Sequence, residues 1–259
     1  FEGKANQKLV LPTFGKLAAP YMVLLGLGKR SSYNHEIFRM AAGTVAKEAR
    51  RVQSAKIALA LPDEVDVPEA VRAGTEGLRL GSYRYDKWKT GDEKEKAFRI
   101  THASLHGETL RRNTAAQQAL ELGNAIGEAV AFARDLVNES PSVMTPTALA
   151  NAAQKVAKEA GLSVTIHDKK KLEQLKMGMF LAVAQGSQQA PRMIELRYTP
   201  KGATAAKAKP LAFVGKAITF DSGGLSLKPA DAMVDMKTDM AGGAAVIAAM
   251  KVIGAVIKP

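Results

Sequence analysis

Short apolar segments alternate with amphipathic, helix-like segments along most of this 259-residue chain. Buried strands are expected at 21–29, 55–62, 97–104, 163–167, 192–199 and 210–220. Helices are expected at 34–53, 67–83, 113–137, 146–160, 169–176 and 241–256. Asn34 and Thr145 stand where N-caps belong, and Pro146 suits a first helical turn. Strands that alternate with helices favour an α/β layer with a largely parallel sheet. The fold class is therefore predicted as α/β.

The composition excludes several classes of protein. The chain has no cysteine, which rules out disulfides, thiolate nucleophiles and cysteine-based zinc sites. No unbroken apolar run approaches the ~20 residues that a bilayer-spanning helix needs, so no membrane association is expected. The first residues, "FEGKANQKLVLP", have neither the basic start nor the apolar centre of a signal peptide. We therefore expect a cytoplasmic protein.

The net charge of +12 is unevenly distributed along the chain. From Phe220 onward four Asp and four Lys cancel, so the whole excess lies upstream. A basic surface there can attract nucleic acid or acidic partners, although it can equally be a solvated surface without a partner. The single Trp and the few other aromatic residues offer no stacking platform for a single strand.

Two lysines and two aspartates surround a pair of glycines near the end of the chain. "VGKAITFDSGGLSLKP" is followed almost at once by "MVDMKTDMAGG", which places Lys216, Asp221, Lys228 and Asp239 at the expected end of a buried strand. Charges at such a place are costly unless they are paired or bind a metal. Ligand sites of α/β sheets form at the carboxyl ends of strands, so a functional site is expected here.

The spacing of these four residues leaves two interpretations open. Carboxylates are hard ligands for divalent cations, and a pair of them can flank two metals roughly 3.5–4 Å apart. Lys216 would then ligate as a neutral amine, while Lys228 stays charged and polarises a carbonyl. Alternatively, two salt bridges, Lys216–Asp221 and Lys228–Asp239, close a loop.

Other candidate residues carry weaker signals. The four histidines all lie outside this motif: His35, His102, His106 and His167. His102 and His106 are four residues apart, but "FRITHASLH" is typical of a strand running into a loop. No serine has a G-x-S-x-G context, which argues against a serine hydrolase.

The motif resembles the leucyl aminopeptidase (cytosol aminopeptidase) family of two-metal exopeptidases. The spacing of the two lysines and two aspartates agrees with that family residue by residue. The upstream segments "EGLRLGSYRYDKWK" and "ARDLVNESPSVMTPTALA" agree as well, so the likeness covers nearly the whole chain. The resemblance implies a smaller amino-terminal α/β domain at 1–112, a linking helix at 113–137 and the first part of a mixed-sheet α/β metallopeptidase domain at 138–259.

The resemblance also implies a role for each site residue. Lys216, Asp221 and Asp239 would be metal ligands. Lys228 would be the catalytic lysine that binds the scissile carbonyl oxygen of the substrate. Met236 would line the hydrophobic pocket for the substrate's first side chain. A metal-activated water would then release amino-terminal residues, leucine or other apolar ones preferred, from peptides.

Cofactors and assembly follow from the same resemblance. It implies two divalent ions per subunit, zinc or manganese, with bicarbonate as a proton shuttle, in a homohexamer. The family's remaining aspartate, glutamate and arginine should lie downstream of Pro259, so we expect this chain to be part of a longer one and to be inactive alone. Two alternative functions stay open: DNA binding by a basic family member, and a non-catalytic scaffold.

Overall fold

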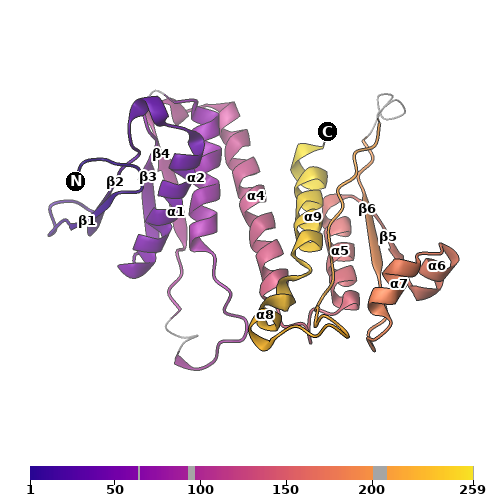
Figure 1. Ribbon diagram of the computed structural model, residues 1–259. Helices are drawn as coiled ribbons and strands as arrows, with labels where there is room; N and C mark the ends of the chain where they lie inside the picture. Colours follow the sequence, from indigo (N-terminus) through magenta and orange to yellow (C-terminus); the bar gives the residue numbers. More distant parts are fainter. Residues whose placement is uncertain (64, 93–96, 201–208, 259) are drawn as a thin grey trace. The chain divides into compact units, whose positions relative to one another are not determined.

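The computed structural model describes residues 1–63, 65–92, 97–200 and 209–258. The chain divides into two compact units, Phe1–Glu128 and Ala129–Pro259. Helix α4 (Thr114–Asn138) runs through this division (Figure 1). The α/β class expected from the sequence is confirmed. The domain boundaries implied by the resemblance stay a prediction.

The first unit combines short strands with two helices that pack closely together. Its elements before α4 are β1 (Lys8–Pro12), β2 (Tyr21–Leu25), α1 (His35–Arg51), β3 (Lys56–Ala60), α2 (Val67–Ser82) and β4 (His102–His106), with 3-10 turns at Arg30–Ser32 and Glu108–Leu110. Strands β1 and β2 pair antiparallel, and β3 and β4 pair parallel. The core lies between α1, α2 and β3, around Phe38, Ala42, Ile57 and Ala70.

The second unit is built around α5 (Pro146–Ala160) and α9 (Ala241–Val252). Its other elements are β5 (Ser163–His167), α6 (Lys169–Gln174), α7 (Gly178–Ala184), β6 (Met193–Arg197), α8 (Ala230–Val234), a 3-10 turn η4 (Asp235–Thr238) and a π-helical end η5 (Ile253–Ile257). Strands β5 and β6 pair antiparallel. Leu149, Val156, Met240 and Ile247 are at most 4% exposed and form the centre of this core.

The helix starts follow from the capping residues that the sequence predicts. The Asn34 side chain accepts a hydrogen bond from the Ile37 amide, and the Thr145 hydroxyl accepts one from the Ala148 amide. Each cap satisfies an amide that has no partner within the helix. The expected N-caps are therefore confirmed, and α1, α2, α4, α5 and α9 lie within a few residues of their predicted bounds.

Three strand predictions are wrong in part. The sheet is not largely parallel, because two of the three strand pairs in the described residues are antiparallel. Strand β4 occupies His102–His106 rather than 97–104. The apolar run 210–220 forms no strand, and Val214 within it is 95% exposed. An apolar run shows only that burial is favourable, whereas a strand needs a partner for its backbone hydrogen bonds.

One helical stretch is more apolar than the search for unbroken apolar runs indicates. Ala230–Ile257 is long and apolar enough to cross a bilayer, judged by length and composition alone. The unbroken-run criterion missed it because charged residues divide the stretch. Its α9 part buries Ala244 and Ile247 in the second core, which is the ordinary role of an apolar helix in a folded domain.

Glycine lets α1 and α2 approach each other at van der Waals distance. A methyl group on Gly77 would lie 2.1 Å from the Arg39 carbonyl oxygen. A methyl group on Gly43, on the facing helix, would come no closer than 3.4 Å to any atom outside its own helix, namely the Gly77 carbonyl oxygen. Of these two glycines, only Gly77 leaves no room for a methyl group.

We predict that Gly77→Ala destabilises the first unit by about 1–3 kcal/mol, because the clash outweighs the helix propensity that alanine adds. Gly43→Ala is the matched control and should be neutral or stabilising. Thermal denaturation measures both variants. Equal melting temperatures for the two variants would contradict this account of the helix contact.

A buried carboxylate ties β1 to α1. Glu48 is 5% exposed and forms ion pairs with Lys8 and with Arg51, the latter at 2.7 Å. Hydrogen bonds from Lys8 and then Arg51 lower the pKa of Glu48 below its ordinary value. The charged carboxylate therefore stabilises the folded unit at any pH above the ordinary range of glutamate, near pH 4.

Glu48→Gln should cost about 1–2 kcal/mol at neutral pH, because the neutral amide replaces a charged acceptor. The wild-type advantage should be lost as the pH falls below 4 and through the lowered pKa of Glu48. Hydrogen exchange of the α1 amides, measured at pH 7 and pH 3, reports this difference locally. A mutational effect that is the same at both pH values would show that the charge of Glu48 is not what stabilises the contact.

Candidate metal and active site

Glycines bring the start of α9 against the backbone around Lys216. A methyl group on Gly215 would lie 2.3 Å from the Gly242 carbonyl oxygen, and one on Gly243 would lie 2.6 Å from the Ala217 side chain. The Gly243 amide donates to the Lys216 carbonyl oxygen at 2.6 Å. The start of α9 therefore lies directly against a segment that is not a strand.

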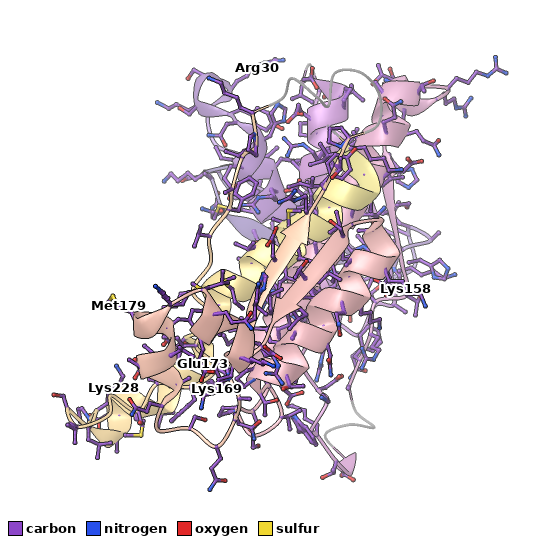
Figure 2. The ribbon with its side chains drawn as sticks, turned by 90° about the vertical axis from the view of Figure 1, so that its right-hand side faces the viewer. Arg30, Lys158, Lys169, Glu173, Met179 and Lys228 are labelled. Carbon is purple, nitrogen blue, oxygen red and sulfur yellow. The ribbon has the colours of Figure 1, made fainter. Side chains whose placement is uncertain are left out.

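A tight turn holds Asp221 and Lys228 together. Gly223 and Gly224 adopt φ values of +93° and +73°, which side chains with a Cβ rarely tolerate. The Lys228 amide donates to the Ser222 carbonyl oxygen at 2.9 Å, which closes the turn. As a result the Lys228 ammonium lies 3.3 Å from Asp221 Oδ2, on the segment that precedes α8 (Figure 2).

Asp239 lies between the η4 turn and the second core. Its amide donates to the Met236 carbonyl oxygen at 3.2 Å, and the next residue, Met240, is fully buried. Its Oδ1 lies 3.1 Å from the Lys216 ammonium. Its Oδ2 is buried and has no hydrogen-bond partner. A buried carboxylate oxygen without a partner is costly, so a cation bound at this atom would be stabilised.

Each of the two lysines pairs with the aspartate that was predicted to pair with the other lysine. The structure forms Lys216–Asp239 and Lys228–Asp221, so the predicted pairs Lys216–Asp221 and Lys228–Asp239 are wrong. Backbone contacts decide the pairing: the α9 start holds Lys216 beside Asp239, and the glycine turn returns Lys228 to Asp221. Sequence separation alone could not reveal either constraint.

The two ion pairs form one charged cluster. The pKa of Asp221 is lowered chiefly by the Gly223 amide, which donates to Oδ1 at 2.8 Å. The Lys228 ammonium lowers it further, and so does the charge of Lys216, against an opposing effect of desolvation. Asp221 is thus held as a carboxylate, which is the form that binds a cation.

The donor atoms fit a divalent cation that further ligands complete. Two carboxylates and the Lys216 amine supply hard oxygen and nitrogen donors. In the described parts of the chain, no three His, Asp or Glu side chains gather into a metal cluster. The histidines lie elsewhere: His102 and His106 are on β4, and His167 faces Glu195 at 3.5 Å. Met236 is on the η4 turn, three residues before Asp239.

Sequence reasoning missed two residues that shape this site. Gly215 allows the α9 contact, and its position directly before Lys216 was the only signal for it. The Lys237 ammonium donates to the Asn138 carbonyl oxygen at 3.3 Å, across 99 positions of sequence. No local pattern predicts a contact of that range.

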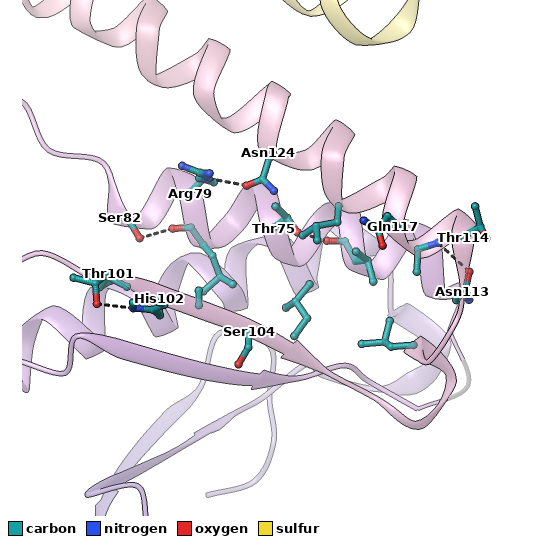
Figure 3. A pocket seen from close by; sticks show the side chains of 18 of the residues that line it. Thr75, Arg79, Ser82, Thr101, His102, Ser104, Asn113, Thr114, Gln117 and Asn124 are labelled. Carbon is teal, nitrogen blue, oxygen red and sulfur yellow. Dashed lines mark hydrogen bonds between the residues drawn. The ribbon is translucent and has the colours of Figure 1, made fainter.

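A separate hollow of about 880 Å³ lies in the first unit, between α2, β4 and the start of α4 (Figure 3). Arg79 on its wall donates to Asn124 at 2.8 Å and pairs with Glu128 at 3.1 Å. The wall contains none of the residues of the lysine–aspartate cluster.

Comparisons with known proteins point to one family. Residues 131–259 match the model of the cytosol aminopeptidase family's catalytic domain, and residues 1–92 match its N-terminal domain. A probable cytosol aminopeptidase from a Geobacter strain is 41% identical over 97% of this chain and 50% of its own length. One from Acidobacterium capsulatum is 40% identical over 100% of this chain and 50% of its own.

Solved structures give the same picture. A mutant tomato leucine aminopeptidase matches with a TM-score of 0.82 and 30% identity, over 100% of this chain and 48% of that one. The bottromycin maturation enzyme BotP, in complex with Mn, matches with a TM-score of 0.81 and 31% identity, over 98% of this chain and 51% of that one. The chain thus spans about half the length of the relatives that it matches. Both domain models of one family match this chain, and the two relatives align with 97% and 100% of its residues. The chain therefore belongs to the cytosol aminopeptidase family.

Proposed function

We propose that the complete protein is a metal-dependent aminopeptidase. The observation that carries this proposal is the buried, unpartnered Oδ2 of Asp239 inside a cluster of two carboxylates and two ammonium groups. Membership of the family supports the peptidase activity, and relatives named as aminopeptidases favour it over DNA binding or a scaffold role.

Lys216, Asp221 and Asp239 are the proposed ligands of two divalent ions, zinc or manganese. Bound ions of this kind lower the pKa of water and act as Lewis acids on a carbonyl. Lys216 is 57% exposed at its side chain, so it can move away from Asp239 Oδ1 toward a bound ion. The Asp239 side chain is only 15% exposed, so it is the most rigidly held of the three proposed ligands.

Lys228 and Met236 are the proposed contacts to substrate. The Lys228 side chain is 30% exposed, so its ammonium can reach a bound peptide. A charged donor aimed at the scissile carbonyl oxygen stabilises the negative charge that develops there. Met236 supplies an adaptable apolar surface for the first side chain of the substrate, which favours leucine and similar residues.

The remaining features of the proposal come from the family likeness. They are a homohexamer, bicarbonate as a proton shuttle, and a cytoplasmic location. Further ligands are proposed to come from the part of the family's length that this chain does not span. Chelation of the complete protein should abolish cleavage of leucine amides, and activity that survives exhaustive chelation would refute the proposal.

Lys228→Ala in the complete protein should lower kcat by about 10²–10³-fold with little change in KM, because the lysine acts on charge that appears in the transition state. Lys155→Ala is the control, since Lys155 is an exposed lysine on α5 of the same unit and should leave kcat unchanged. Steady-state kinetics on a leucine amide measures both. Unchanged turnover in Lys228→Ala would show that Lys228 takes no part in the catalytic step.

Asp239→Asn should weaken metal binding at least 10-fold, because a neutral amide replaces a buried carboxylate ligand. Bound metal raises the melting temperature by mass action, so thermal denaturation across a manganese titration measures the affinity. Asp235→Asn, an exposed aspartate four residues away, is the control and should bind as the wild type does. Equal metal affinity in both variants would exclude Asp239 as a ligand.

A further inference from the structure

The turn that carries Asp239 is fastened at one point to a distant part of its own unit. Lys237 lies in η4, two residues before Asp239, and its side chain is partly buried. Its ammonium donates to the carbonyl oxygen of Asn138 at 3.3 Å. Asn138 is the last residue of α4. The contact therefore joins the ligand-bearing turn to the end of a 25-residue helix.

The end of α4 is a favourable place for an ammonium group. The last carbonyl groups of a helix have no partner within the helix, and they carry the negative end of the helix dipole. A cation that donates to one of them gains both a hydrogen bond and a favourable charge interaction. Among the residues of α4's last turn, none is a lysine or an arginine. Lys237 provides from another element the positive charge that the last turn of α4 lacks.

The contact matters for Asp239 because it is a side-chain hydrogen bond from η4 to an element far away along the chain. Downstream, Met240 is fully buried and the α9 start is hydrogen bonded to the Lys216 backbone. Upstream, η4 continues directly from α8, and the Asp235 amide donates to the Met233 carbonyl oxygen. Within the turn, Thr238 donates to the Asp235 carbonyl at 2.7 Å, and Asp239 donates to that of Met236. Internal bonds fix the shape of the turn, but they do not fix its position.

We infer that Lys237 is a positioning residue, which holds the η4 turn against the α4 end and so aims the Asp239 carboxylate at the metal. This inference rests on the proposed function. Lys237 does not itself contact metal or substrate in this account; it acts through Asp239. Groups that orient a metal ligand typically change metal affinity 10–100-fold when they are removed.

Metal affinity and kinetics of the complete protein test the inference. We expect Lys237→Met to weaken manganese binding on the order of 10-fold, measured by titration calorimetry on chelator-stripped protein. The kcat of this variant should return close to the wild-type value at saturating manganese, because the chemical groups are intact. Lys237→Arg should recover most of the affinity, since it keeps the charge and the donor.

Lys251→Met is the matched control. Lys251 is another partly buried lysine of the same unit; it pairs with Glu159 at 3.5 Å and lies over the Phe132 ring. Its removal deletes a comparable set of contacts away from the cluster. We therefore expect Lys251→Met to bind manganese with wild-type affinity, whatever its melting temperature.

Each other result would overturn the inference. Wild-type affinity in Lys237→Met would show that the contact does not aim Asp239. Equal losses in Lys237→Met and Lys251→Met would show only a general loss of stability. Lys237→Arg behaving like Lys237→Met would show that the donated hydrogen bond is not what matters. If the wild-type protein itself binds no manganese or zinc, the proposed function fails first, and that result is distinct from all three.

Discussion

The candidate site depends on one backbone contact, the 2.6 Å hydrogen bond from the Gly243 amide to the Lys216 carbonyl oxygen. It joins a segment without regular secondary structure to the first turn of α9, which the second core holds in place. A side chain at Gly215 or Gly243 would separate the two backbones. Without this contact Lys216 and Asp239 would not face each other.

The candidate site contains a buried polar atom without a hydrogen-bond partner, as do Tyr33 and His35 in the first unit. Helices α1, α2 and α5 are capped by side chains, and Glu48, the buried carboxylate of the first unit, has two cationic partners. Asp239 instead leaves one buried oxygen without a partner. Local violations of such rules concentrate at functional sites, where a ligand or substrate restores the balance.

Sequence patterns predicted those features that local interactions decide. Asn34 and Thr145 start their helices as expected, because a cap acts within three residues. The charged cluster was also located, since its members lie within 24 positions around recognisable glycines. The partner of each lysine was not predictable, because two separate backbone contacts determine it.

Features that depend on distant residues escaped prediction for the same reason. The run 210–220 has the composition of a buried strand, yet composition cannot supply the neighbour that a strand needs. The Lys237–Asn138 contact joins elements 99 positions apart, and neither residue stands in a pattern that indicates the other. Long-range contacts of this kind require the three-dimensional arrangement.

The exposed apolar run around Val214 has a consequence for the behaviour of this chain in solution. Leu211, Val214 and Leu227 are each at least 69% exposed, and they flank a backbone with few internal hydrogen bonds. Such a segment readily pairs with a second copy of itself or adsorbs to other apolar surfaces. These exposed side chains therefore favour association of the isolated 259-residue polypeptide, whereas its net charge of +12 opposes association.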